Sequence, residues 1–198
     1  GMGKVYQKLV KGPSVQQLID LGVLVDVDGW APSEPDLSKV RKVAGDWAEG
    51  ELAEEMTKLA GNSVPEWLER AGGRKTIVFA SGIAHSQDIV RRFQAAGVTA
   101  EHLDGETPDG EREAILARLR SGQTTVVSNC AVLTEGFDMP SIRCVVMARP
   151  TMSLVLHMQT AGRGLRPGEE KPIILDHAGN VGRHGVPHED REWSLEST

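Results

Sequence analysis

Short apolar runs, rich in Val and Ile, alternate with longer amphipathic stretches in the second part of the chain. Continuous apolar runs of this length are typical of strands buried on both faces of a parallel sheet, and the helical patterns between them indicate βαβ units. Right-handed crossovers would place those helices on both faces of the sheet. The pattern therefore predicts an α/β fold, a three-layer sandwich with a mainly parallel sheet. Its expected strands are Thr76–Ala80, Val98–Leu103, Thr124–Ser128, Ile142–Ala148 and Pro172–Asp176.

Two amphipathic helices are expected between the first three strands. Gly97 and Gly122 follow them and predict where they end. Thr107 is expected to cap the second helix, with Pro108 in its first position. The apolar residues that share the inner faces are Ile89, Val90, Phe93, Ile115, Leu116 and Leu119.

Residues 1–73 have a different pattern, with two prolines breaking regularity at 31–36. We interpret them as a lead-in segment from a missing first domain, packed on a second domain at 74–198. Trp67 and Leu68 are available for that packing. The elements expected here are a helix and turn at Val15–Leu24, a strand at Leu24–Trp30, and helices at Gly50–Leu59 and Val64–Ala71.

The composition is that of an ordinary folded chain. Hydrophobic residues make up 39% and charged residues 25% of 198 residues, which excludes wholesale disorder. No apolar run approaches the roughly 20 residues needed to span a bilayer. Cys130 and Cys144 fall in or beside expected strands, which favours buried thiols in a reducing compartment, so we expect a cytoplasmic protein. The net charge of −6 argues against binding nucleic acid by bulk basicity but leaves local phosphate contacts open.

A Q-x-x-G-R-x-x-R cluster at Met158–Pro167 carries the strongest chemical signal. Arg163 and Arg166 lie three residues apart, which would place them on one face of a helix start. A guanidinium is always charged and offers a rigid fork of donors, so this pair suits a polyphosphate. An ordinary surface turn is the alternative for the decapeptide alone.

Two further stretches precede this cluster, Thr76–Gly82 and Asn129–Asp138, the latter reading N-x-x-V-L-T-E-G-F-D. In this order and spacing, the three resemble motifs IV, V and VI of superfamily 2 DEAD/DEAH-box helicases. The resemblance is greatest to RadD-like, phage-type and XPB-type proteins and restriction translocases. It implies the RecA-like C-terminal domain of a P-loop NTPase helicase.

The resemblance implies a nucleotide-binding role for motifs V and VI. Arg166 would be an arginine finger and Arg163 a second contact to the γ-phosphate, the two catalytic residues. Asp138 would contact the ribose. The remaining expected nucleotide-site residues are Gly136, Gln159 and Gly162, with Gly136 allowing close backbone approach.

Nucleic acid would be contacted by a second set of residues, mainly through phosphate. Cys130 stands where the family often carries a hydroxyl, so its own hydrogen bond is in question. Ligands of parallel sheets bind beyond the carboxyl ends of the strands, where we expect this set and the motif VI loop to meet. The set consists of Ser81, Gly82, Asn129, Cys130, Thr134 and Arg112.

The chain contains neither a G-x-x-x-x-G-K-[ST] loop nor a D-E-x-[DH] box. We therefore expect ATP and Mg²⁺ to be bound mainly by a missing first RecA-like domain of the same protein, and the chain alone to be inactive as an ATPase. Its other partner would be nucleic acid, with DNA favoured over RNA, and no membrane is expected. A non-catalytic nucleic-acid-binding module and the motor part of a restriction translocase are the alternatives. His184 and His188 have a metal-ligand spacing, but we expect no metal site.

Overall fold

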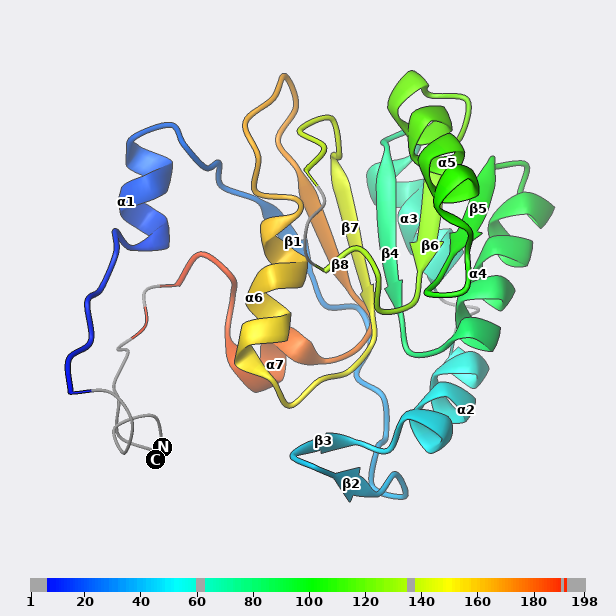
Figure 1. Cartoon of the computed structure of the whole chain (residues 1–198), viewed down its shortest axis with the longest axis horizontal. Coiled ribbons are helices and arrows are strands. Elements are labelled where there is room, and N and C mark those ends of the chain that lie inside the picture. The colour runs from blue at the N-terminus through cyan, green and yellow to red at the C-terminus, as the bar shows by residue number, and fades with distance from the viewer. Residues whose placement is uncertain (1–6, 60–62, 135–137, 190, 192–198) are drawn as a thin grey trace.

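The computed structural model describes residues 7–59, 63–134, 138–189 and 191. Six strands form one sheet in the order β1-β8-β7-β4-β6-β5, and every pairing within it is parallel (Figure 1). The five strands expected in the second part of the chain are all present: Thr76–Ala80 has the expected bounds, and the other four begin one or two residues later than expected. The strands are β1 (Asp28–Trp30), β4 (Thr76–Ala80), β5 (Ala100–Leu103), β6 (Val126–Asn129), β7 (Cys144–Ala148) and β8 (Ile173–Asp176).

Helices cover both faces of this sheet and make three layers (Figure 1). On one face, α5 (Asp109–Ser121) and α6 (Leu154–Gly162) bury Leu119 and Ala161 against the strands. On the other face, α3 (Ser63–Ala71) and α4 (Ile83–Ala95) bury Trp67 and Phe93, whose ring centroids lie 5.2 Å apart in an edge-to-face arrangement. The α/β three-layer prediction is confirmed.

The segment before residue 74 contributes to the same body. Its strand β1 pairs with β8, and the α3 residue Trp67 donates from Nε1 to Thr76 Oγ1 at 2.7 Å. Leu68 was expected to pack as well, but it is 48% exposed. The division at residue 73 stays a prediction, because no contact in the structure marks it as a domain boundary.

A helix, a hairpin and a second helix of this segment lie outside the main sheet. The helix α1 (Val15–Asp20) has no buried residue and lies apart from the sheet, at the left of the view in Figure 1. A small antiparallel hairpin, β2 (Lys42–Val43) and β3 (Asp46–Trp47), was not predicted from the sequence. The hairpin leads into α2 (Glu49–Leu59), which packs on α4 near the carboxyl ends of the strands (Figure 1).

The predicted ends of α4 and α5 are confirmed, but the predicted N-cap of α5 is wrong. Gly97 and Gly122 have φ of 77° and 86°, a left-handed conformation that favours glycine and ends α4 and α5. Thr107 does not cap α5, because Pro108 occupies the N-cap position and the Thr107 hydroxyl bonds to Asp104 instead. The short helix α7 (Asn180–His184) follows β8 and contacts α6.

No helix in the described ranges is long and apolar enough to cross a membrane. Cys144 is fully buried, and burial raises the pKa of its thiol to about 12. Cys130 is only half-buried, so the expectation of two buried thiols holds for Cys144 alone. Partial burial also raises the pKa of the Cys130 thiol, which keeps it protonated near neutral pH.

Candidate nucleotide and nucleic-acid interface

The two arginines of motif VI lie at the end of a helix rather than at a helix start. The helix α6 ends at Gly162, Arg163 is its C-cap, and Arg166 follows in the next loop. Because α6 runs back beside β7, this loop rises beyond the amino ends of the strands (Figure 1). The prediction that motif VI meets Ser81 and Gly82 at the carboxyl edge is therefore wrong.

Motif V connects the two edges of the sheet. It begins at Asn129, the last residue of β6, and the chain returns to the amino end of β7 at Arg143. On this path, Asp138 Oδ1 lies 3.4 Å from the Arg166 Nε. The Arg163 Nη2 donates to the carbonyl oxygen of Thr134. Motifs V and VI therefore contact each other at both arginines.

The two arginines differ in exposure. The side chain of Arg166 is 41% exposed, so its ion pair with the 65% exposed Asp138 leaves it accessible from solvent. Arg163 is half-buried between Thr134 and the helix end. Arg163 is thus held by the domain itself, and Arg166 is the more accessible donor.

Glycines near the helix end have unequal roles. A Cβ at Gly164 would lie 3.0 Å from Val145 Cγ2, so this glycine lets the helix end approach β7. A Cβ at Gly162 would meet nothing within 4 Å, so close packing does not explain that residue. Gln159 is half-buried on α6. Gly136 lies outside the described residues.

Ser81 and Asn129 lie at the carboxyl edge with their side chains turned to internal partners. Ser81 is 4% exposed, and its hydroxyl donates to Ala148 O at 3.0 Å. Asn129 is fully buried, its Nδ2 donating to Val78 O at 2.9 Å and its Oδ1 accepting from Leu133 N at 3.3 Å. In this geometry both residues shape the edge, and neither side chain is presented to a ligand.

Gly82 and Cys130 complete the carboxyl-edge set. A Cβ at Gly82 would lie 2.8 Å from the Cβ of Ala53, so α2 covers this glycine at close range. The first turn of α2 carries Glu49 and Glu51, which pair with Arg149 at 3.6 Å and with Arg41 at 2.6 Å. Cys130 donates its backbone N–H to Leu103 O at 3.0 Å, so that amide is already used within the sheet edge.

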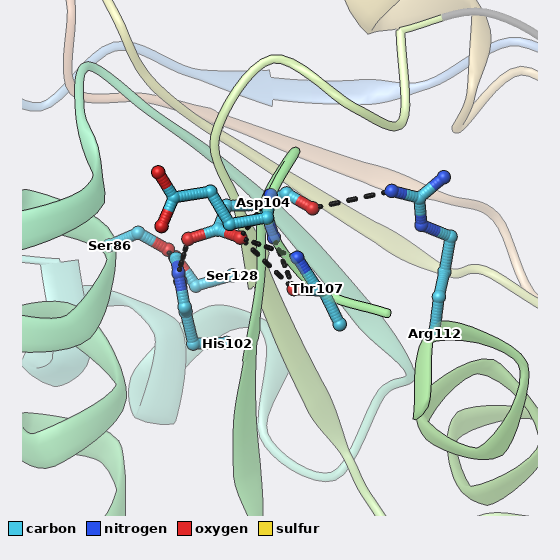
Figure 2. Close-up of polar contacts among 7 residues, drawn as sticks. Ser86, His102, Asp104, Thr107, Arg112 and Ser128 are labelled. Atoms are coloured by element: carbon cyan, nitrogen blue, oxygen red, sulfur yellow. Dashed lines mark hydrogen bonds and ion pairs between the residues drawn. The ribbon is translucent and has the colours of Figure 1, made fainter. Parts of the chain in front are cut away.

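Arg112 belongs to a separate polar cluster around the end of β5 (Figure 2). Its Nη2 lies 3.4 Å from the carbonyl oxygen of Asp104, and its side chain is 33% exposed. The Asp104 Oδ1 accepts from Glu106 N at 2.9 Å and from the amide and hydroxyl of Thr107 at 3.0 and 3.1 Å. These bonds fix the loop that carries the carbonyl facing Arg112.

A chain of hydrogen bonds, here called the relay, supports the same loop from the interior of the domain. The Asp104 Oδ2 lies 2.9 Å from His102 Nε2, and His102 Nδ1 lies 2.7 Å from the hydroxyl of Ser86 (Figure 2). Ser86 in turn bonds to Ser128 at 2.7 Å. Hydrogen bonding to His102 is the largest cause that lowers the pKa of the Asp104 carboxyl. Both serines are fully buried, so the relay is a support and cannot act as a nucleophile toward an outside substrate.

Sequence reasoning missed Arg143 and Asp104. Asp104 directly follows an expected strand and Arg143 lies near the start of another, and neither stands in a motif that marks it as functional. His184, considered for its metal-ligand spacing, stacks on His157 with centroids 5.3 Å apart and places Nε2 2.8 Å from Thr151 O. Within the described ranges, no three His, Cys, Asp or Glu side chains gather closely enough to hold a metal ion.

Comparison with known proteins defines the class to which this fold and site belong. Residues 59–168 match the helicase conserved C-terminal domain, which covers more than half of the chain. The chain belongs to this family, the C-terminal RecA-like domains of superfamily 2 helicases and translocases.

Individual relatives agree with that class. The chain is 32% identical over 195 residues to a 51.5 kDa protein of a Lactococcus phage (isolate 7-9), covering 98% of this chain and 43% of that protein. It is 42% identical over 120 residues to the "Putative mitochondrial ATP-dependent helicase irc3" of Schizosaccharomyces pombe, covering 59% of this chain and 20% of that protein. The chain thus spans less than half the length of these relatives.

A solved structure shows the same fold over most of the chain. It is a fragment of a "putative HsdR subunit of a type I restriction enzyme" from Vibrio vulnificus YJ016, with a TM-score of 0.69 and 20% identity. The match covers 88% of this chain and 36% of that one, and at this identity it establishes the fold alone.

Proposed function

We propose that the chain is the second motor domain of an ATP-dependent superfamily 2 DNA helicase or translocase. The observation that carries the proposal is the contact of Arg166 with Asp138, which joins motif VI to motif V and leaves the Arg166 side chain 41% exposed. A donor that belongs to one domain and faces solvent is placed to reach a nucleotide held by another domain. Family membership supports the same role.

In this proposal Arg166 is the arginine finger and Arg163 a second γ-phosphate contact. ATP would supply the transferable γ-phosphoryl group, and the guanidinium of Arg166 would stabilise the negative charge that develops on it. Such a finger is worth about 10³–10⁵ in rate. The contact of Arg163 with the Thr134 carbonyl oxygen gives it a fixed position between motifs V and VI.

Asp138 has two partners in the working cycle that we infer. Without nucleotide it pairs with Arg166, and with nucleotide its carboxylate accepts a hydrogen bond from the ribose. Release of the ion pair then frees Arg166 for the phosphate. The Mg²⁺ ion and the phosphate-cradling loop belong to the first RecA-like domain in this scheme.

Nucleic acid would be bound through phosphate at the carboxyl edge of the sheet. Arg112 is the residue we favour, since its partly exposed guanidinium has only long contacts to Asp104 and Asp109, of 3.4 and 4.0 Å. Ser81 and Asn129 would act indirectly by shaping the edge, because their side chains have internal partners. Backbone amides near Gly82 and Cys130 would contribute only after local rearrangement.

The test compares turnover in the full-length protein that contains this chain. Arg166→Ala should lower kcat for DNA-stimulated ATP hydrolysis by at least about 10²-fold and change KM for ATP less, because a finger acts mainly in the transition state. Arg166→Lys should recover little, since an ammonium cannot reproduce the guanidinium fork. Arg91→Ala, on an exposed face of α4, is the control.

The chain alone should show no ATP hydrolysis above background, with or without DNA. Hydrolysis that co-purifies with the chain and persists in Arg166→Ala would contradict the proposal. Normal turnover of the full-length Arg166→Ala protein would remove Arg166 from its assigned role.

A further inference from the structure

The guanidinium of Arg143 donates hydrogen bonds to backbone carbonyl oxygens of motif VI and of the end of the motif V loop. Its Nη1 donates to the carbonyl oxygen of Arg166 at 2.9 Å, and its Nη2 donates to that of Pro167 at 3.0 Å. The same Nη2 donates to the carbonyl oxygen of Pro140, at the end of the motif V loop. Three carbonyl oxygens from two motifs therefore share one cation.

The base of this side chain is fixed by the sheet. Arg143 directly precedes β7, and its backbone N–H donates to Lys75 O at 3.0 Å. Its own carbonyl oxygen accepts from Ile173 N at 3.0 Å, on the strand at the other side. A residue held between two neighbouring strands is a rigid point from which to position a loop.

Gly168 makes room for the guanidinium. A Cβ at this position would lie 1.7 Å from the Arg143 Nη2 and 2.3 Å from its Cζ. The guanidinium thus occupies the space that any other residue would fill. The loop after Arg166 therefore packs closely against the side chain of Arg143. No sequence motif marks either Gly168 or Arg143.

From this geometry we propose that Arg143 is a positioning residue for the arginine finger. It holds the main chain of Arg166 and Pro167 against the end of motif V, so that the Arg166 side chain starts from a fixed place beside Asp138. This inference rests on the proposed function of Arg166. Arg143 itself does not touch the nucleotide, because its donors are engaged by backbone carbonyl oxygens.

The first experiment measures the position of the loop without relying on activity. Hydrogen–deuterium exchange of the 198-residue chain should rise in Arg143→Ala over residues 163–170, by at least about tenfold, as expected when a local restraint is removed. Exchange in β4 and β7 should stay unchanged. Lys75→Ala is the matched control, since Lys75 also donates to a carbonyl oxygen, that of Arg120 at 2.5 Å, but holds the end of α5. Unchanged exchange over 163–170 in Arg143→Ala would overturn the proposal.

The second experiment measures turnover in the full-length protein. Arg143→Ala should lower kcat by about 10- to 100-fold with little change in KM for ATP, because a finger displaced by about 1 Å loses most of its effect. Arg143→Lys should recover only part of this loss, since a single ammonium cannot span three carbonyl oxygens. Lys75→Ala should keep normal turnover.

A double-mutant cycle separates positioning from a general loss of stability. In an Arg166→Ala background, Arg143→Ala should lower kcat no further, because the side chain that it positions is gone. Independent, multiplying losses would overturn the inference. Gly168→Ala is a second variant that keeps the guanidinium but displaces it, and it should reproduce the exchange and kcat effects.

Failure of the two proposals can be told apart. Normal turnover in Arg166→Ala would remove the proposed finger, and the positioning role would fall with it. Normal turnover in Arg143→Ala, beside a strong loss in Arg166→Ala, would overturn the positioning role and leave the finger intact.

Discussion

Arg166 and Asp138 form an ion pair across two motifs, with 3.4 Å between the Nε of one and the Oδ1 of the other. Both side chains are partly exposed to solvent, 41% for Arg166 and 65% for Asp138, so the pair contributes little stability by itself. Its significance is positional, since it keeps the proposed finger beside the proposed ribose ligand. A weak contact of this kind can exchange for nucleotide contacts at low cost.

Replacing Asp138 should therefore affect nucleotide binding more than folding. In the full-length protein, Asp138→Asn should raise KM for ATP by about tenfold, the usual value of a charge-assisted hydrogen bond, with a smaller change in kcat. The unfolding free energy of the 198-residue chain should change by less than about 1 kcal/mol. Glu111→Gln, which breaks another exposed pair with Arg118 far from the site, is the control. A large stability loss with unchanged KM would make the pair structural.

The sheet was predictable because burial on both faces leaves a direct signature in the sequence. Every residue of β7 and β4 is buried, which gives each strand an uninterrupted apolar run. The hairpin β2–β3 carries no such signature. Its strands have two residues each and present Lys42 and Asp46 among their few side chains.

The arrangement of the candidate site residues could not be predicted from the sequence. The rule that ligands bind beyond the carboxyl ends of parallel strands misplaced motif VI, because α6 brings Arg163 and Arg166 back toward the amino ends. The sequence also could not reveal that Asn129 uses both of its side-chain atoms internally. Which partner a polar atom finds depends on packing that no local pattern records.

Asn129→Ala should destabilise the chain strongly. The change leaves the Val78 carbonyl oxygen and the Leu133 amide without their side-chain partner in a fully buried place. A buried group left unsatisfied costs about 1–3 kcal/mol, so we expect a loss of about 2–4 kcal/mol in the unfolding free energy. Urea unfolding of the 198-residue chain measures it, with Gln87→Ala on the exposed face of α4 as the control. A change below 0.5 kcal/mol, on the order of an ordinary surface substitution, would contradict the internal role.

Stability should fall as the pH drops from about 7 toward 4.5. Burial lowers the pKa of His85 and of His157 from 6.5 to about 4, so the unfolded chain binds protons at a pH where the folded chain does not. The contribution of the two neutral histidines to the unfolding free energy is fully present above pH 6.5 and is lost as the pH falls toward 4. At about 1.4 kcal/mol per pH unit, each histidine should cost up to 2–3 kcal/mol at pH 4.5.

Asp176, whose pKa is raised by burial, offsets part of this loss because its folded form takes up a proton more readily. Urea unfolding at pH 7 and pH 4.5 checks the direction. His157→Gln should reduce the difference between the two values, whereas His188→Gln, with a 37% exposed side chain, is the control. Equal stability at both pH values would show that His85 and His157 do not govern acid sensitivity.

Binding of single-stranded DNA should depend on salt through Arg112. Contacts to phosphate alone predict weak binding that is indifferent to sequence and weakens steeply as salt rises. Arg112→Ala should lower affinity uniformly across sequences and reduce the slope of log K against log salt by about 1, because one phosphate contact is lost. The side chain is 33% exposed and only loosely held by Asp104 and Asp109, so its removal should leave the fold intact.

Fluorescence anisotropy with labelled strands of different sequence, over a range of salt, measures both effects. Arg91→Ala, which removes an equally charged side chain from the exposed face of α4, should leave the slope unchanged. A strong preference for one sequence, or a slope that Arg112→Ala does not alter, would exclude Arg112 as a phosphate contact.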